Sequence, residues 1–191
     1  MKKRIYIVLI ICMVLLIGAC NSKGGQVKPI DERISYIAGA WTDDVYINEF
    51  GGIKFTLPVN WYYATNEELA SERNPDSFFA LLARHNNNRP SLVVMIDRVT
   101  SEIQTEFHDA YTYLVMVKEA YDKNYSGFVT EEIQETTLAG KSCFTFNLVR
   151  DDLSLMRYYA FMVEDYVFSI SVIAPDLDAI NEVMSYFSPT N

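Results

Sequence analysis

Nucleophilic hydrolysis needs a base beside the nucleophile, and this chain offers few pairs of that kind. Outside its first twenty residues the one thiol is Cys143, and the only histidines are His85 and His108. A lone cysteine in a strand is usually a small packed hydrophobe. There is no Gly-x-Ser-x-Gly motif, and Gly51-Gly52 does not open a phosphate-binding loop. We therefore predict that Cys143 packs in the core and that the chain has no catalytic constellation.

Acidic pairs are the remaining source of reactive or metal-binding groups. They are Asp43-Asp44, Glu131-Glu132, Asp151-Asp152 and Glu164-Asp165. Hard cations such as Ca²⁺ take several oxygen ligands, and glycosidases use two carboxylates, but no pair has calcium-loop spacing and nothing selects two acids for catalysis. Zinc lacks enough histidine and cysteine ligands. We predict solvated acids at turns, no metal site and no cofactor, and keep a weak calcium site as an alternative.

Aromatic side chains are better candidates for a binding surface. Trp61, Tyr62 and Tyr63 are contiguous, and alternation along a strand places Tyr62 opposite its two neighbours. Tyr113 departs from the apolar stripe of a predicted helix. Exposed aromatic clusters mark partner or ligand surfaces. We predict that Trp61 fills the core and that Tyr62 and Tyr113 contribute to a binding surface.

The N-terminal region indicates export. Lys2, Lys3 and Arg4 precede an apolar run, 5–17, which is short for a membrane-spanning helix and typical of a signal peptide. Gly18 and Ala19 then lead to Cys20. The run Ile-Gly-Ala-Cys resembles the lipobox of bacterial lipoproteins, which implies cleavage of residues 1–19 and a diacylglyceryl group on Cys20. An ordinary secretory signal or an anchor helix is the alternative.

Composition agrees with an exported, folded domain. Half of the 191 residues are hydrophobic and 14% are aromatic, which argues against disorder. Removal of residues 1–19, with their three positive charges, takes the formal net charge from −9 to −12. Nucleic acid and anionic lipid would repel such a domain. We therefore expect a membrane partner only through lipidated Cys20, an unknown protein partner in the envelope, and no nucleic acid.

The predicted elements follow a polar tether, 20–35, and form one domain, 36–191. A hairpin joins strands 45–50 and 53–57 through a tight turn at Gly51-Gly52. A capping box at Thr65 starts a short helix. The further strands are 78–84 and 92–99, both buried on nearly both faces, then 128–138, one that contains Phe144, Phe146 and Leu148, 155–163 and 166–173. A helix at 105–123 has an apolar face of Phe107, Tyr111, Leu114, Val117 and Tyr121, and a last helix after Pro175-Asp176 has one of Leu177, Ile180, Met184 and Phe187. Short connections favour antiparallel pairing in an α+β sandwich.

One stretch of this pattern carries a resemblance. Residues 46–61, Tyr-Ile-Asn-Glu-Phe-Gly-Gly-Ile-Lys-Phe-Thr-Leu-Pro-Val-Asn-Trp, look like the opening of PsbP-like domains: a hairpin, an aromatic strand and Pro-x-x-Trp. The resemblance implies a PsbP-like α/β/α sandwich in which helices cover an antiparallel sheet. It also implies an assembly or binding role; the metal-centre role of photosynthetic members has no matching motif here.

We expect from these features a non-enzymatic binding or assembly module, lipid-anchored at the extracytoplasmic face of the cell membrane. Because Asn21 follows Cys20, the outer membrane is allowed in a cell with two membranes. Two alternatives stay open: an envelope hydrolase or transferase that uses carboxylates or Cys143, and a receptor for a solute or a metal.

Overall fold

The structure is a computed structural model that describes residues 32–70, 76–100, 107–125, 127–150 and 154–190. The predicted signal peptide, Cys20 and most of the predicted tether lie outside the described residues, as does the pair Asp151-Asp152. Within the described ranges, no helix has both the length and the apolar character needed to cross a membrane.

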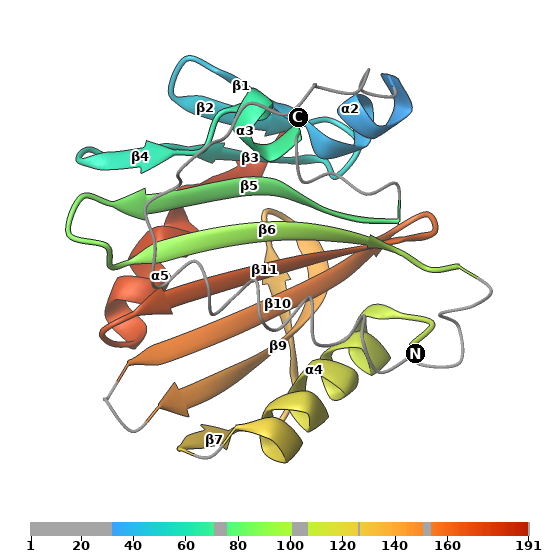
Figure 1. The fold of residues 1–191 in the computed structure, drawn as a ribbon, viewed down its shortest axis with the longest axis vertical. Helices are drawn as coiled ribbons and strands as arrows, with labels where there is room; N and C mark the ends of the chain where they lie inside the picture. The colour runs from blue at the N-terminus through green and yellow to red at the C-terminus, as the bar shows by residue number, and fades with distance from the viewer. Residues whose placement is uncertain (1–31, 71–75, 101–106, 126, 151–153, 191) are drawn as a thin grey trace.

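Single helices separate groups of consecutive strands along the described parts of the chain (Figure 1). The helices are α2 (Glu32–Ala38), α3 (Asn66–Ala70), α4 (Ala110–Asn124) and α5 (Leu177–Ser185). The strands are β1 (Ala40–Thr42), β2 (Val45–Asn48), β3 (Ile53–Thr56), β4 (Trp61–Tyr63), β5 (Ser77–His85), β6 (Ser91–Arg98), β7 (Phe128–Thr130), β8 (Gln134–Leu138), β9 (Lys141–Arg150), β10 (Leu155–Val163), β11 (Tyr166–Ala174) and β12 (Phe187–Pro189).

The strands pair antiparallel in two sheets. The larger sheet runs β4-β5-β6-β11-β10-β9-β7, and β8 pairs with the first half of β9. The smaller sheet runs β1-β2-β3-β12. At the centre of the larger sheet, β10 and β11 pair along their whole lengths, from Leu155 opposite Ala174 to Val163 opposite Tyr166. The antiparallel pairing predicted from the short connections between strands is therefore confirmed.

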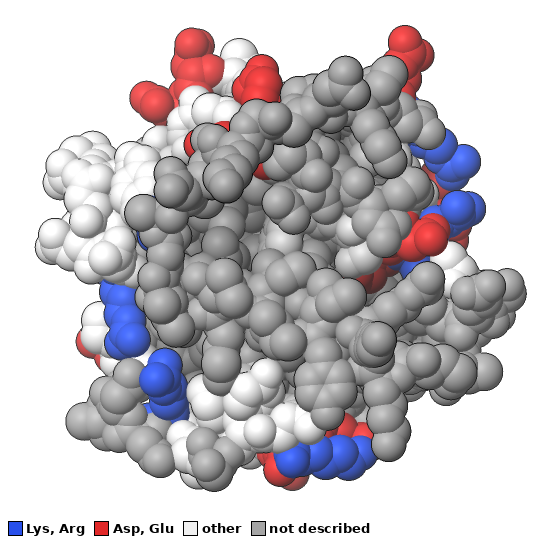
Figure 2. Space-filling model, in the orientation of Figure 1, with Lys and Arg blue, Asp and Glu red and all other residues white. Residues whose placement is uncertain are grey.

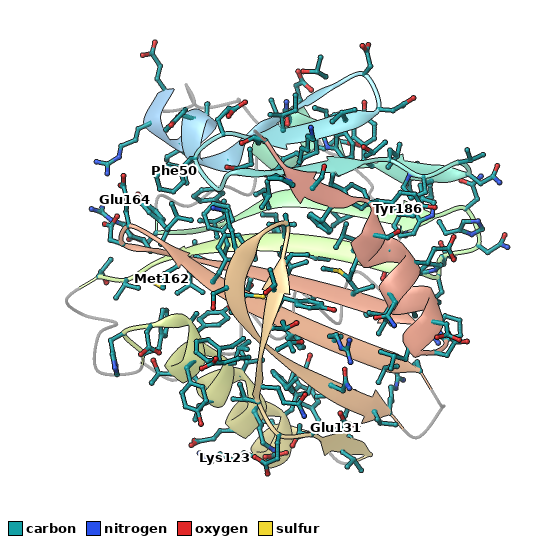
Figure 3. All side chains as sticks on the ribbon, turned by 180° about the vertical axis from the view of Figure 1, so that it is seen from behind. Phe50, Lys123, Glu131, Met162, Glu164 and Tyr186 are labelled. Atoms are coloured by element: carbon teal, nitrogen blue, oxygen red, sulfur yellow. The ribbon has the colours of Figure 1, made fainter. Side chains whose placement is uncertain are left out.

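The two faces of the larger sheet carry different cores. Tyr158 and Tyr159, neighbours on β10, point to opposite faces of the sheet. Tyr158 packs with α4, on what we call the α4 face, whereas Tyr159 belongs to the main core with α2, α5 and the smaller sheet, on the α5 face. Figure 1 shows α4 in front of the sheet, and Figure 3, from behind, shows α5 in front. The predicted α+β architecture, with helices over both faces, is confirmed.

The first hairpin is present, but its turn differs from the prediction. The turn has four residues, 49–52, and of the two glycines only Gly52 has a positive φ, +62°. Gly51 is required for space, since a Cβ there would lie 2.7 Å from the ring of Phe168. The Gly51 N–H donates to Oδ1 of the fully buried Asn48 at 2.6 Å. This bond ties the turn into the core.

The helix starts follow local capping. At α3 the predicted capping box is confirmed: Thr65 N donates to Glu68 Oε2 at 2.7 Å, and Glu68 N donates to Thr65 Oγ1 at 3.3 Å. The long helix begins later than predicted, because the side chain of Asp109 accepts from Thr112 N and caps α4. His108, expected in the first turn, precedes the helix.

The apolar faces of the long helices are also shifted. The buried residues of α4 are Ala110, Tyr113, Leu114, Val117, Ala120 and Tyr121, whereas Tyr111, predicted on that face, is 46% exposed. In α5 the buried residues are Ile180 and Val183; Leu177 is exposed, and Phe187 belongs to β12. Phe107 lies before the helix, so the four-residue spacing between Phe107 and Tyr111 does not place the two residues on one helix face.

The predicted elements do not include α2, β1 or β12, and β7 and β8 are predicted as one strand; β4 is anticipated only by the alternation of Trp61, Tyr62 and Tyr63. Each of the two missed strands has three residues, too few to show a period. The helix α2 begins at Glu32, inside the predicted tether, and its partly buried Ile34 packs against the main core.

Candidate functional site

Tyr62 lies at the surface, as predicted, on β4 at the end of the larger sheet. Its side chain is 36% exposed. Opposite it on β5, the Arg84 guanidinium carbon lies 4.5 Å from the centre of the Tyr62 ring, and the buried Arg84 Nε has no hydrogen-bond partner among the described residues. Val59, just before β4, is 86% exposed. The side chains are accessible to a partner, and their role in binding stays a prediction.

Tyr113 is not at the surface, so its assignment to a binding surface is wrong. It is 3% exposed and lies on the buried face of α4. Its hydroxyl donates to Asp97 Oδ2 at 3.0 Å and lies 3.2 Å from Ser169 Oγ. Tyr113 departs from the predicted apolar stripe because its hydroxyl meets polar partners beneath the helix, not because it faces solvent.

These partners form what we call the acid cluster: Ser77, Asp97, Tyr113 and Ser169. Asp97, on β6, is 7% exposed, and its Oδ1 accepts from Ser77 Oγ at 2.5 Å. Burial raises the pKa of Asp97 from 3.8 to about 6, although the hydrogen bonds from Ser77 and Tyr113 act in the opposite direction. A carboxyl group with this pKa exchanges its proton near neutral pH. Because α4 covers it, the cluster joins the helix to the sheet.

The α5 face carries a second polar group, which we call the polar row: Glu131, Asn147, Arg157 and Tyr159. Asn147 on β9 lies opposite Arg157 on β10, and Arg157 Nε donates to Asn147 Oδ1 at 2.5 Å. Asn147 Nδ2 donates to Glu131 Oε2 at 2.6 Å. The Arg157 guanidinium carbon lies 6.0 Å from the centre of the Tyr159 ring. The side chains therefore run side by side across the sheet.

Unlike the acid cluster, the polar row reaches solvent. Glu131 is exposed, Asn147 and Arg157 are half-buried, and only Tyr159 is buried. Burial raises the pKa of Tyr159, and a hydrogen bond from Arg157 opposes that shift. Figure 3 shows Glu131 at the β7 end of the α5 face.

An apolar strip continues this face beyond the polar row. Val149 follows Asn147 by two residues and therefore points the same way. Its cross-strand partners are Val129 on β7 and Leu155 on β10. Val149 is 36% exposed and Val129 is 66% exposed. The open end of the α5 face thus combines hydrogen-bonding groups with exposed aliphatic carbon.

The thiol and imidazole groups do not come together. Cys143 is 1% exposed in the main core, as predicted, and burial raises its pKa from 9.0 to about 11. His85 ends β5, and three strands stand between β5 and β9, so the two residues are separated by four strand spacings, about 19 Å. His108 precedes α4 on the other face, where its Nε2 lies 3.4 Å from Asp109 Oδ2.

The described acidic pairs behave mostly as solvated charge. In Figure 2 acidic side chains gather at the end of the molecule that carries α2, α3 and the β1–β2 turn with Asp43-Asp44. Asp165 pairs with Arg98, whose Nε donates to Oδ2 at 2.8 Å and lowers the Asp165 pKa. Across the described ranges, no group of three or more His, Cys, Asp and Glu side chains is placed to hold a metal ion.

Sequence reasoning missed both Asp97 and Arg157. A signal existed for Asp97, because it is a charged residue in a run predicted to be buried on both faces. Arg157 is a charged residue within the predicted strand 155–163. Their partners could not be inferred, since Tyr113 and Ser77 reach Asp97 from a helix and another strand, and contacts of this kind depend on the folded register.

Neither a protein-family model nor a curated protein sequence matches the chain. Among solved structures, the chain is similar to the cyanobacterial PsbP protein (CyanoP) from Synechocystis sp. PCC 6803. The TM-score is 0.50 and the identity 15%, over 91% of this chain and 99% of the cyanobacterial one. At this identity the likeness shows the fold alone, and it confirms the predicted PsbP-like fold.

Two further structures are similar at lower scores. LpqN, described as involved in cell envelope biogenesis of Mycobacterium tuberculosis, gives a TM-score of 0.47 at 18% identity, over 73% of this chain and 83% of its own. The Ran-binding protein Mog1p of Saccharomyces cerevisiae gives 0.45 at 11% identity, over 74% of this chain and 92% of its own. Scores below 0.5 add nothing to the fold assignment.

Proposed function

We propose that the mature chain is a lipoprotein held at the extracytoplasmic face of a membrane by acylated Cys20, and that its PsbP-like domain binds a partner rather than converting a substrate. The observation that carries this proposal is the position of Cys20. It closes a lipobox-like sequence, and the first described helix begins twelve residues later, at Glu32. Twelve residues span at most about 40 Å, so the domain would lie within that distance of the lipid.

The distribution of polar groups supports binding. The most reactive groups in the described residues, the Cys143 thiol and the Asp97 carboxyl, are buried and have pKa values raised by burial. The groups that reach the surface, Tyr62 with Arg84 and the polar row, are hydrogen-bonding and aromatic side chains held by their neighbours. Such groups recognise a partner without forming a covalent bond to it.

Charge supports a domain that stands off the membrane. Exposed acids, among them Glu32 at the start of α2, gather at the end where the chain enters the domain. Anionic headgroups repel such a surface within a Debye length, about 8 Å at physiological salt. The lipid would therefore hold the domain near the membrane while charge keeps it from lying on the surface. The same arrangement suits an outer membrane in a cell with two membranes.

Metabolic labelling tests the anchor. Cells that express the full chain are grown with an alkyne fatty acid, and the protein is captured, tagged and fractionated. We expect label and membrane association for the wild-type chain and loss of both for Cys20→Ser, because two acyl chains give stable attachment. Cys12→Ser is the matched control, since it removes another N-terminal thiol and should leave both readouts unchanged. Label that survives in Cys20→Ser would overturn the proposal.

A further inference from the structure

We propose that the polar row binds a neutral, hydroxyl-rich ligand, which is the chemistry of a glycan. The inference deepens the proposed function, because it names a ligand class for the binding domain. It rests on the contacts among Glu131, Asn147, Arg157 and Tyr159 and on the exposed strip beside them.

The polar row places donors and acceptors in sequence across the sheet. The Arg157 guanidinium has five N–H donors, and its Nε–H is used on Asn147. The Glu131 carboxylate has two oxygens, and Oε2 is used on Asn147. Arg157 also donates a hydrogen bond to Tyr159, so the remaining Nη donors of Arg157 lie at one end and Oε1 of Glu131 at the other. A sugar hydroxyl both donates and accepts, so neighbouring hydroxyls can satisfy both ends at once.

The charge of the polar row favours a neutral ligand. Within the polar row, the positive charge of the Arg157 guanidinium and the negative charge of the Glu131 carboxylate cancel. The neutral carboxamide of Asn147 hydrogen-bonds to both groups. The mature chain has a formal charge of −12, so it repels anions at long range. A phosphate or carboxylate ligand would gain Arg157 but would meet Glu131 at the same site. A neutral polyol meets no such opposition.

The exposed strip supplies the apolar half of the site. Val129, Val149 and Leu155 lie side by side across three strands, next to Asn147 and Arg157. Sugar rings carry C–H faces as well as hydroxyls, and binding sites of small molecules combine apolar lining with a few placed polar groups. Oligosaccharides extend over several rings, which suits a row that continues into an apolar strip.

The polar groups are also held in place before any ligand arrives. Hydrogen bonds of 2.5 and 2.6 Å fix the planes of Arg157 and Asn147, and both residues stand on paired strands rather than on loops. Little side-chain freedom is then lost on binding, which lowers the entropic cost of forming the complex.

The test is calorimetric titration of the full-length chain, purified in a detergent without a sugar headgroup. The ligands are three tetrasaccharides: neutral chitotetraose, neutral maltotetraose and anionic tetragalacturonate. We expect saturable binding of at least one neutral ligand, with weaker binding of the anionic one. Arg157→Gln should weaken binding at least tenfold, and Glu131→Gln, at an exposed residue, should weaken it several-fold without loss of folding.

Arg150→Gln is the matched control, because it removes the same charge from β9 on the α4 face, where its guanidinium carbon lies 5.9 Å from the ring of Phe128. It should leave the affinity unchanged. Failure of both neutral ligands to bind the wild-type chain, preference for tetragalacturonate, or equal losses in Arg157→Gln and Arg150→Gln would overturn the inference. The labelling experiment is independent: an anchored chain that binds neither neutral glycan refutes only the ligand class, and an unanchored chain that binds one refutes only the anchor.

Discussion

The acid cluster and the polar row lie on opposite faces of the larger sheet, and they differ in what covers them. The acid cluster on the α4 face lies under a helix, with Asp97 7% exposed and Tyr113 3% exposed. The polar row on the α5 face ends in the exposed side chain of Glu131, beside the exposed Val149. Both groups arise from the same alternation of side chains along neighbouring strands.

The comparison indicates that a covering helix determines whether a polar group stabilises the fold or stays available for binding. Under α4, the Asp97 carboxyl group loses hydration and its pKa rises. Because the hydroxyl groups of Tyr113 and Ser77 replace water as its donors, the carboxyl group serves to hold the helix on the sheet. On the open face, the side chains keep access to solvent and can exchange water for a ligand. Substitutions should therefore change stability on the first face and binding on the second.

The largest expected effect is the loss of Tyr113. Tyr113→Ala removes a buried ring and the hydroxyl that donates to Asp97, leaving both a cavity and a carboxyl with one donor fewer. Deletion of a buried aromatic side chain costs about 3–5 kcal/mol of the free energy of unfolding. Urea unfolding followed by circular dichroism measures the change.

Tyr111→Ala on the same helix is the matched control. Tyr111 is 46% exposed and contacts Phe144 with ring centres 5.4 Å apart, so its loss should cost about 1 kcal/mol or less. Equal losses in the free energy of unfolding for Tyr113→Ala and Tyr111→Ala would show that α4 does not cover the acid cluster as the structure indicates. The contrast between a covered and an open face would then fail.

The next effect is the pH dependence of stability that comes from Asp97. Its folded pKa, about 6, lies above the ordinary 3.8, so folding disfavours the charged form. The contribution of Asp97 to the free energy of unfolding is therefore most favourable below about pH 4, and it falls as the pH rises to about 6. The difference between a pKa of 3.8 in the unfolded chain and about 6 in the folded one corresponds to about 3 kcal/mol of the free energy of unfolding.

Asp97→Asn isolates this effect, because it keeps the shape and removes the titration. Urea unfolding of both proteins is measured from pH 3.5 to pH 8. The free energy of unfolding of the wild-type chain relative to Asp97→Asn should fall by about 3 kcal/mol between pH 4 and pH 7 and then stay constant. Parallel curves would contradict a raised pKa, since all other carboxyl groups titrate alike in both proteins.

The sequence predicted best what local pattern controls. The ends of β10 at residues 155 and 163 and the cap at Thr65 were correct, because turn acids and a capping box leave their mark within a few residues. The antiparallel α+β fold followed from short connections and from the PsbP-like opening, in which Gly51 and Asn48 have paired roles.

What the sequence could not give depends on contacts between distant segments. Tyr113 was assigned to the surface because its spacing broke an apolar stripe, and only the pairing of α4 with β6 and β11 reveals a polar partner beneath it. The polar row likewise joins Glu131, in the link between β7 and β8, to Asn147 on β9 and Arg157 on β10. A charged residue inside a predicted strand is the one local signal that both groups share.

The smallest expected effect lies at the edge of the larger sheet, where Tyr62 on β4 and Arg84 on β5 form a partly exposed cation–π pair. An exposed cation–π contact contributes about 0.5–1 kcal/mol. Tyr62→Ala should therefore lower the free energy of unfolding by about 1 kcal/mol or less, and a double-mutant cycle with Arg84→Met should give a coupling of the same size. A coupling above 2 kcal/mol would place this pair with the covered acid cluster. A small coupling makes the pair a sensitive reporter, because a partner that loses affinity for Tyr62→Ala, while stability is nearly unchanged, must touch that side chain directly.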